Sequence, residues 1–553
     1  MTGLRMNEKL IDAAENLEQA HIRKKRLLKS ASIVSLMTGI SRLGGLVREM
    51  AMAYFFGTSA LKSAFDIAFL IPNLFRRLFG EGALAGAFVP VFNESLVLEG
   101  RERANLLAMR VMGLLIVLLS IAVAAGVALT FLLPGFLPLG SKWLIPLPMI
   151  RLLLPYAVLI CVAAMVAGML NSVGRFAISA FAPFVLNFIW VIALAVICVF
   201  VTQDKNMQIR LLCMVILVAG VLQIAIQLPL LRREGFFFKP LFRGAFSDSR
   251  VITIVQLMGP AALTMGVFQI NVFFDSFLAY WVGPYGPAAL GYAERLTYLP
   301  LGLFGTAFMT VLLPVFSKYA AAGEYRRISD DLEDSLVNMT LVILPCSLGL
   351  IALALPVISM IYRTKGGAFD ADSALLSSRA LIAYAPGLLV FCFQKAVTPA
   401  FYALQDMKTP LRVSMAGVVL NIVLNLTSIA LLPQGWKHAG IALATVVTTT
   451  VNVGVLYWLL KKRIGGVNHS RVGGVFGKTL VAAILMAFIA HGAHGALQAL
   501  LPADKAAQII AVLASIAAGG AVYALLLAIF CRNELSHVTS IMVKRFRRKN
   551  DRG

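Results

Sequence analysis

Long apolar segments recur along almost the whole chain, and they limit its fold more than any other feature. Of the 553 residues, 59% are hydrophobic and 14% are charged, and the mean hydropathy is +0.85. Soluble domains are about 45–50% apolar and about 25% charged, and one soluble core stops growing at roughly 250–300 residues. The excess of apolar residues therefore predicts an integral membrane protein.

A membrane-spanning helix needs about 20 mainly apolar residues, and we count fourteen such segments. They are 31–56, 63–93, 105–133, 150–171, 178–201, 211–230, 251–281, 288–316, 334–360, 378–403, 411–432, 439–460, 474–498 and 506–530. The sequence thus predicts an all-α polytopic membrane protein with about 14 transmembrane helices. An even number of spans places both termini on one side of the membrane.

Basic residues mark that side. Connectors such as LRREGFFFKPLFRG (231–244) and KKRIGGVNHSR (461–471) fall on the same side as both terminal tails. Most of the 49 Lys and Arg residues lie there, in a roughly fourfold excess over the opposite side. Because Lys and Arg gather on the cytoplasmic side, we predict an N-in, C-in topology, with basic cytoplasmic tails at 1–29 and 532–553.

An internal repeat divides the spans. RLFGEGALAGAFVPVF (77–92) recurs as GLFGTAFMTVLLPVF (302–316), and APFVLN (182–187) resembles AGVVLN (416–421). Six spans separate the copies, so both have the same orientation, as in two-lobed secondary transporters with a central site. We predict two six-helix lobes as parallel repeats, plus two extra C-terminal helices. The predicted regions are 30–232 for the N-lobe, 233–462 for the C-lobe and 463–531 for the extra pair.

Charged residues interrupt the apolar spans, although each costs at least about 2.5–3.5 kcal/mol at the bilayer centre on insertion scales. A planar guanidinium fork suits phosphate oxygens. We therefore predict that four arginines line a water-filled cavity between the lobes and bind a diphosphate: Arg42, Arg48, Arg76 and Arg295. Six residues would supply supporting cavity charges: Glu49, Asp66, Arg77, Glu81, Glu294 and Lys395.

Two further expectations concern how these charges are held. Gly44 and Gly45 permit a break in the first span that would aim Arg42 and Arg48 inward. The alternative role for the charges is structural pairing, as between Arg48 and Glu49 or between Arg77 and Glu81.

Other function classes find little support in the sequence. It carries no aspartate-rich diphosphate–metal motif, no GxxxxGK[ST], no HExxH and no GxSxG motif, so we expect no enzymatic activity and no cofactor. A channel would favour repeated pore motifs. The alternatives that stay open are a flippase for another polyprenyl-linked oligosaccharide, a cationic-drug exporter, a polytopic enzyme of polyprenyl phosphates, and a scaffold.

Several segments together resemble the MurJ/MviN lipid II flippases of the MOP exporter superfamily. They include SRLGGLVRE (41–49), IPNLFRRLFGEGALAGAFVPVF (71–92), LNSVGRFAISAFAP (170–183) and FYALQDMKTP (401–410). The resemblance runs from about residue 30 to the last span. It implies movement of undecaprenyl-diphosphate-linked peptidoglycan precursor (lipid II) to the periplasmic leaflet of the bacterial inner membrane, by alternating access. It also implies that the last two helices form a groove for the lipid tail.

The resemblance also places the family's functional arginines on Arg42, Arg48, Arg76 and Arg295. The chain departs from the family pattern at Ser63, where an Asp is usual, and at Tyr298, where an acidic residue is usual. The partners implied are lipid II and membrane lipids, without nucleic acid, and a monomer acting near cell-wall synthesis enzymes.

Three polar residues in the spans suggest an ion. Asp275 lies in the seventh span, and Asn421 and Asn425 lie one helical turn apart in the eleventh. Oxygen ligands of this kind suit a hard cation, so these residues form a candidate sodium site for ion coupling. Asparagines in spans also serve simply to join helices by hydrogen bonds.

Overall fold

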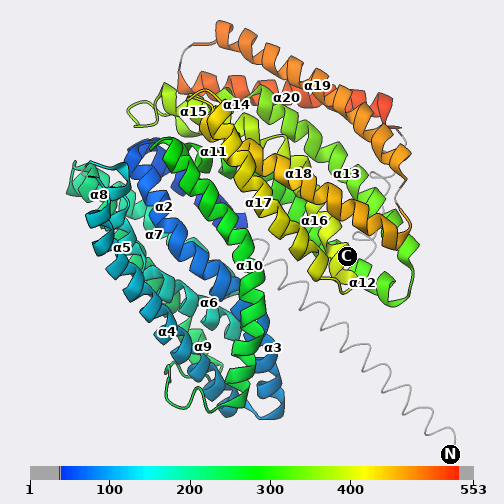
Figure 1. Ribbon diagram of the computed structural model, residues 1–553. Coiled ribbons are helices and arrows are strands. Elements are labelled where there is room, and N and C mark those ends of the chain that lie inside the picture. The colour runs from blue at the N-terminus through cyan, green and yellow to red at the C-terminus, as the bar shows by residue number, and fades with distance from the viewer. Residues whose placement is uncertain are drawn as a thin grey trace, which may run out of the picture. The chain divides into compact units, whose positions relative to one another are not determined.

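The computed structural model describes residues 37–534 apart from positions 38, 139, 467, 503 and 533. The predicted tail 1–29 and nearly all of the predicted tail 532–553 lie outside the described residues. The described residues form helices and connecting loops, without a β-strand. They fall into two compact units (Figure 1). Unit 1 contains the chain up to Ala51 and Ala68–Gly266, and unit 2 contains Met52–Ile67 and the chain from Val267 onward.

The helices of the first half of the chain follow a helix at 39–56. They are α2 (Ala60–Phe75), the π-helix η1 (Arg76–Gly82), α3 (Ala83–Leu98), α4 (Arg101–Leu132), the 3₁₀ helices η2 (Leu133–Phe136) and η3 (Lys142–Leu144), α5 (Leu147–Leu153), α6 (Tyr156–Ser172), α7 (Phe176–Val196), the π-helix η4 (Ile197–Val201), α8 (Lys205–Ala225) and α9 (Leu228–Arg233). The long helix α10 (Ser249–Val282) contributes to both units.

The remaining helices belong to unit 2. They are α11 (Gly286–Pro300), the π-helix η5 (Leu301–Gly305), α12 (Thr306–Ala321), α13 (Tyr325–Ala352), α14 (Ala354–Tyr362), α15 (Ala371–Tyr384), α16 (Gly387–Ala403), α17 (Lys408–Leu431), α18 (Lys437–Ile464), α19 (His469–Leu500) and α20 (Lys505–Phe530).

Eight described helices are long and apolar enough to cross a membrane, and the number rises to ten when two bent helix pairs each count as one span. The all-helical, multi-pass fold is therefore as predicted, while the count of fourteen spans stays a prediction. The predicted spans 63–93 and 288–316 are each interrupted by a π-helix, η1 or η5. The predicted span 334–360 is divided, because α13 ends at Ala352 and α14 begins at Ala354.

The same irregularities occur in both halves of the chain. The bends between α5 and α6 and between α15 and α16 are both 43°. Pro155 and Pro386 cap the second helix of each pair, where a proline lacks the N–H that would continue the first helix. The turns after α6 and α16 each contain a residue with positive φ, Gly174 and Gln405 respectively. Each half thus repeats a π-helix, a bent span and a left-handed turn in the same order.

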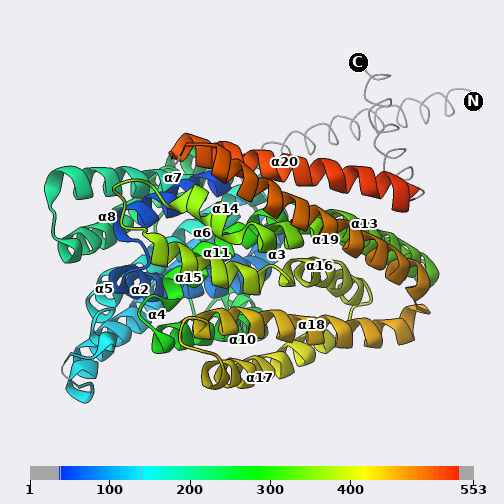
Figure 2. The ribbon, with the colours of Figure 1, turned by 90° about the horizontal axis from the view of Figure 1, so that it is seen from above.

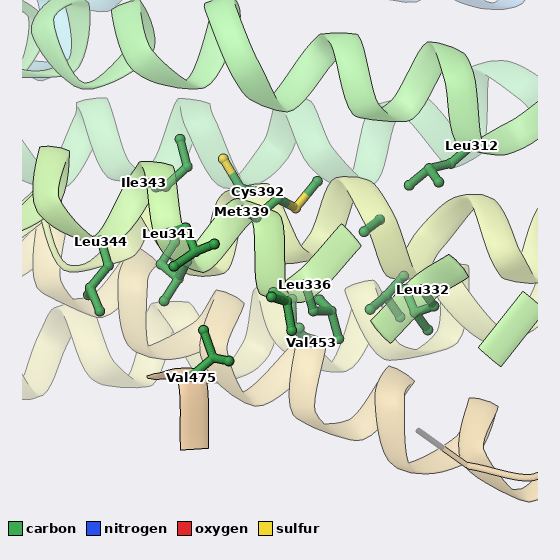
Figure 3. Close-up of a cluster of buried hydrophobic side chains, with 14 of the residues drawn as sticks. Leu312, Leu332, Leu336, Met339, Leu341, Ile343, Leu344, Cys392, Val453 and Val475 are labelled. Carbon is green, nitrogen blue, oxygen red and sulfur yellow. The ribbon is translucent and has the colours of Figure 1, made fainter. Parts of the chain in front are cut away.

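The core of unit 2 is a cluster of apolar side chains from α12, α13, α16, α18 and α19 (Figure 3). Leu332, Met339 and Cys392 are fully buried in it. Val453 of α18 and Val475 of α19 also belong to this cluster. In unit 1, Val123 of α4 packs on Leu154 and Ala157. The boundaries predicted for the two lobes and the tail groove were drawn from the sequence repeat, whereas the two units are defined by packing. Those boundaries therefore stay predictions.

Polar side chains cap the start of α15 and the end of α14 in unit 2. Asp370 accepts the Ser373 backbone N–H at 2.8 Å, and this bond holds the pKa of the Asp370 carboxyl below its usual value. At the start of α20, Lys505 donates to the carbonyls of Ser359, Met360 and Arg363 at 3.0, 2.7 and 2.6 Å. Lys505 therefore satisfies the carbonyls at the end of α14 and joins that helix to α20.

The Met52–Ile67 segment is integrated into unit 2 by contacts with the α14–α15 loop and α11. The Ala368 backbone N–H donates to the Tyr54 carbonyl at 2.7 Å, and the Tyr292 hydroxyl donates to the Gly57 carbonyl at 2.9 Å. A Cβ on Gly57 would lie 2.3 Å from the Ala368 carbonyl oxygen, and its φ is +55°. Only glycine fits this close approach without strain.

Helices α19 and α20 lie side by side in both ribbon views (Figures 1 and 2), and α19 also packs on α13. Two neighbouring glycines of α20 differ sharply in their surroundings. A Cβ on Gly519 would meet the Ala490 Cβ at 3.0 Å and the Met486 carbonyl oxygen at 3.2 Å, whereas Gly520 has nothing within 4 Å. Gly519 therefore permits the close approach of α19 and α20.

We expect Gly519→Leu to lower the melting temperature of the detergent-purified protein, because overpacking a helix interface costs about 1–3 kcal/mol. The control Gly520→Leu adds the same side chain to an open position and should leave the melting temperature unchanged or slightly raised. Equal shifts for both variants would contradict the assigned helix interface.

Candidate functional sites in the two units

A buried guanidinium lies at the centre of a polar cluster in unit 1. Arg48 donates through Nη2 to Glu49 Oε1 at 2.7 Å and through Nη1 to Asn187 Oδ1 at 3.1 Å. Its Cζ lies 4.5 Å from the centroid of the Trp190 ring. Arg48 and Glu49 are 7% and 9% exposed, so the pair is shielded from solvent. The predicted Arg48–Glu49 ion pair is therefore present.

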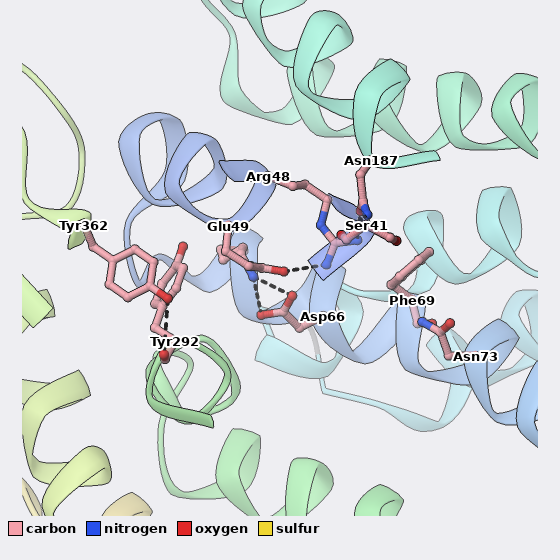
Figure 4. A network of polar contacts seen from close by, with 10 residues as sticks. Ser41, Arg48, Glu49, Asp66, Phe69, Asn73, Asn187, Tyr292 and Tyr362 are labelled. Carbon is pink, nitrogen blue, oxygen red and sulfur yellow. Dashed lines mark hydrogen bonds and ion pairs between the residues drawn. The ribbon is translucent and has the colours of Figure 1, made fainter. Parts of the chain in front are cut away.

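The first helix and α7 bring these residues together (Figure 4). Asn187 Nδ2 also donates to the Ser41 carbonyl at 3.1 Å, which joins the two helices directly. A Cβ on Gly44 would lie 3.5 Å from the Asn187 Cβ. The break predicted at Gly44 and Gly45 is wrong, because residues 39–56 form one continuous helix. Both glycines face Asn187 of α7, at distances where an added Cβ would make ordinary van der Waals contact.

The other predicted unit 1 charges are more open to solvent. Arg42 and Arg77 are exposed, and Arg76 is half-buried at the start of η1. Arg76 Nε donates to Asn73 Oδ1 at 3.3 Å, one turn earlier. The Glu81 side chain lies outside the described residues, so its predicted pairing with Arg77 stays a prediction.

Asp66 belongs to unit 2 and forms an ion pair that its sequence context does not indicate. Lys62 Nζ donates to both of its carboxylate oxygens, at 2.6 and 2.7 Å. Lys62 is only 3% exposed, and its ammonium lies 5.1 Å from the centroid of Tyr292. The neighbouring Ser63 accepts the backbone N–H of Ala288 through Oγ at 3.3 Å. The position where the family usually carries an Asp thus holds a hydroxyl that accepts a backbone hydrogen bond.

Asp275 of α10 lies in a second polar cluster, within unit 2. Its carboxylate accepts Asn425 Nδ2 at 2.7 Å, Thr445 Oγ1 at 3.1 Å and Asn271 Nδ2 at 3.3 Å. Asn425 also donates to Asn421 Oδ1 at 2.8 Å, and both asparagines are fully buried. The three residues of the candidate sodium site therefore lie together. The amide oxygens Oδ1 of Asn271 and Asn425 are buried without a hydrogen-bond donor.

The remaining predicted charges of unit 2 lie on α11 and α16. Arg295 is exposed and Glu294 is half-buried, and Tyr298, one turn after Arg295, is exposed. Lys395 is half-buried and runs beside Gly305 of η5. Arg42, Arg48 and Arg76 thus belong to unit 1 and Arg295 belongs to unit 2, so their predicted convergence on one diphosphate stays a prediction.

Several residues of these clusters were missed from the sequence. Lys62 lies just before the predicted span 63–93, and Trp190, Asn271 and Thr445 are uncharged, so none of the four stood out in the sequence. Asn187 did carry one, since it ends the repeated segment APFVLN whose second copy ends at Asn421.

Known proteins resemble this chain in both sequence and fold. The family model described as "Lipid II flippase MurJ" matches residues 52–511. The probable lipid II flippase MurJ of Vibrio cholerae is 34% identical over 446 residues, covering 78% of this chain and 82% of the relative. The lipid II flippase MurJ of Burkholderia cenocepacia is 30% identical over 476 residues, covering 84% and 90%.

Solved structures show the same fold at lower identity. A lipid II flippase MurJ in an inward closed conformation gives a TM-score of 0.71 at 23% identity, covering 91% of this chain and 99% of that chain. An inward-facing multidrug resistance MATE transporter of the MOP superfamily gives 0.61 at 16% identity, covering 79% and 98%. Because the family model and relatives of at least 30% identity extend over most of the chain, this chain belongs to the MurJ lipid II flippase family of membrane transporters.

Proposed function

We propose that the protein is a flippase that moves lipid II from the cytoplasmic to the periplasmic leaflet of the bacterial inner membrane, where cell-wall synthesis uses it. The observation that carries this proposal is the match of the lipid II flippase family model to residues 52–511. The exposed arginines Arg42 and Arg295 agree with an anionic substrate.

The bilayer opposes passage of the sugar, peptide and diphosphate, but not of the lipid tail. A flippase therefore needs to shield only the headgroup while the tail stays in the hydrocarbon. Alternating access of a central site between two repeats would perform this transfer without opening a pore through the membrane.

We propose that Arg42, Arg76 and Arg295 contact the diphosphate, through charge-assisted hydrogen bonds. Each is at least partly accessible in its own unit. Arg48 has two of its guanidinium nitrogens bonded to Glu49 and Asn187, so we assign it a supporting role in the site rather than a direct contact with the diphosphate. The supporting charges Glu49, Asp66, Arg77, Glu81, Glu294 and Lys395 would balance and shape that potential.

The lipid tail needs a long apolar track, and we propose that α19 and α20 supply it. Both helices carry exposed apolar side chains, among them Phe488, Leu513 and Ile516. The small residues between them allow the close packing described for Gly519.

Energy for transport would come from electrochemical gradients, since the sequence has no nucleotide-binding motif. Membrane potential acts on each charge with about 2.3 kcal/mol per 100 mV. The Asp275 cluster fits a sodium ion: one carboxylate, the amide oxygens of Asn271, Asn421 and Asn425, and the Thr445 hydroxyl supply hard oxygen ligands. A bound sodium ion would neutralise the carboxylate and supply the donor-free amide oxygens with a cation.

The runner-up function is a flippase for another polyprenyl-linked oligosaccharide, which would use the same diphosphate contacts. We further propose an N-in, C-in monomer with fourteen spans that works near cell-wall synthesis enzymes.

Topology is tested with single cysteines in an otherwise cysteine-free protein. A cysteine replacing Lys239 should react with a membrane-impermeant thiol reagent only from the cytoplasmic side, and one replacing Pro284 only from the periplasmic side. The basic connector containing Lys239 predicts this outcome. Labelling of both positions from the same side would contradict the proposed spans.

The headgroup site is tested by alanine variants in cells depleted of the native protein. Arg42→Ala, Arg76→Ala and Arg295→Ala should each reduce outward lipid II by about tenfold or more, because each removes a charge-assisted contact of about 1.5–3 kcal/mol. The measurement is the fraction of lipid-linked precursor accessible to a probe that cannot cross the membrane. Arg→Lys should restore only part, since an ammonium lacks the guanidinium fork. The exposed Arg210 of α8 provides a control, and Arg210→Ala should act like the native protein. Full growth of all three variants would exclude the proposed site.

Ion binding is tested by thermal unfolding in detergent. Replacing choline chloride with sodium chloride should raise the melting temperature of the native protein, because a ligand that binds only the folded state stabilises it. Asp275→Asn and Thr445→Val should abolish this rise. Thr450→Val is the matched control, because the Thr450 hydroxyl donates to the Val446 carbonyl of its own helix, which is not part of the Asp275 cluster. A sodium-dependent rise that survives in Asp275→Asn would refute the site.

A further inference from the structure

The first helix and α10 occupy the same place in the internal repeat. The first helix ends at Phe56, and α10 ends at Val282. The helices that follow them, α2 and α11, begin at Ala60 and Gly286. The two ends are as far apart in the sequence as the two starts. Glu49 and Asp275 have that same separation. The two acidic residues therefore lie at equivalent positions, one in each half of the chain.

Helices α7 and α17 also correspond, here through their repeated segments and with a larger separation in the sequence. The repeated segments APFVLN and AGVVLN end at Asn187 and Asn421, each of which is buried. One turn further along, α7 presents Trp190 and α17 presents Asn425. In unit 1, Asn187 and Trp190 both contact the Arg48 guanidinium, which is also bonded to Glu49. In unit 2, Asn421 and Asn425 belong to the Asp275 cluster.

We infer that the Arg48 guanidinium is the built-in cation of a unit 1 pocket that is the repeat counterpart of the Asp275 cluster of unit 2. Glu49, Asn187 and the Trp190 face form this pocket, and Asn187 and Trp190 are positioning residues for Arg48. The inference rests on the repeat and on the contacts of Arg48, so it does not depend on whether unit 2 binds sodium.

The chemistry of the two pockets supports this assignment. A small metal ion needs several oxygen ligands, and the Asp275 cluster offers one carboxylate, three amides and a hydroxyl. A guanidinium needs hydrogen-bond acceptors at its edge and an aromatic ring against its face. Glu49 and Asn187 supply the acceptors, and Trp190 supplies the ring. Trp190 lies three residues after Asn187 and Asn425 lies four residues after Asn421, so the next turn of each helix supplies a different kind of group to its cluster.

A tethered cation has a functional consequence. Arg48 cannot dissociate, so the charge of the unit 1 pocket stays fixed through the transport cycle. The Asp275 cluster has no such side-chain cation among its described contacts. Any dependence of transport on an exchangeable cation should therefore arise in unit 2 alone.

Chemical rescue tests the built-in cation. Arg48→Ala removes the guanidinium and leaves its acceptors, so flipping in proteoliposomes should fall by about tenfold or more, as expected for breaking a buried charge pair. Guanidinium chloride at low millimolar concentration should restore flipping severalfold and raise the melting temperature of this variant. The native protein should gain neither effect. The matched control Arg48→Ala/Asn187→Leu lacks one acceptor and should not be rescued.

Two results would overturn the inference. One is a folded Arg48→Ala protein that guanidinium neither stabilises nor reactivates. The other comes from comparing Arg48→Lys with Arg48→Gln. Both side chains still fill the pocket, so this comparison can be made even if the alanine variant does not fold. Lys should retain more stability and flipping than Gln, because it keeps the cation, and equal losses would show that the charge is not required. The result of the sodium test on Asp275→Asn does not alter what is expected of the Arg48 variants. Either proposal can therefore fail while the other stands.

Discussion

Hydrocarbon offers no hydrogen-bond partners, and this constraint decides how each polar residue of the spans is arranged. An unpaired charge or amide in such surroundings costs several kcal/mol, so the protein itself must supply partners. Arg48 is bonded to Glu49 and Asn187, Asp66 to Lys62, and Asp275 to two asparagines and a threonine. Helix packing follows from these bonds, because the partners come from different helices in the Arg48 and Asp275 clusters.

The two halves of the chain share backbone irregularities more faithfully than side chains. Both carry a π-helix, a span bent by 43° at a proline, and a turn with positive φ. Such features leave backbone groups without their regular helical partners, which is tolerated in a membrane only where protein or water satisfies them. Their retention in both halves suits a transporter whose helices must bend. The side chains at equivalent positions have instead diverged, as Arg48 and Phe274, the residues before Glu49 and Asp275, illustrate.

Packing also assigns one segment to a unit that its sequence position does not suggest. Met52–Ile67 precedes the rest of the first half, yet it belongs to unit 2. Its backbone bonds to the α14–α15 loop and to Tyr292 use carbonyl and amide groups, which any sequence possesses. Gly57 and, in the α14–α15 loop, Gly367 make that contact possible because they lack a side chain.

The sequence by itself determined the all-helical membrane fold, the family and the internal repeat. Hydropathy, basic connectors and repeated motifs are local properties, and they survive in a single chain without knowledge of contacts. It also identified Arg48 with Glu49 and Asp275 with its two asparagines, because charges in apolar spans stand out. Only the tertiary structure decided which residues surround them. Lys62, Trp190, Asn271 and Thr445 are ordinary within their own helices, and their roles arise when distant helices pack together. The structure likewise decided that the helix continues through Gly44 and Gly45, which lie against α7.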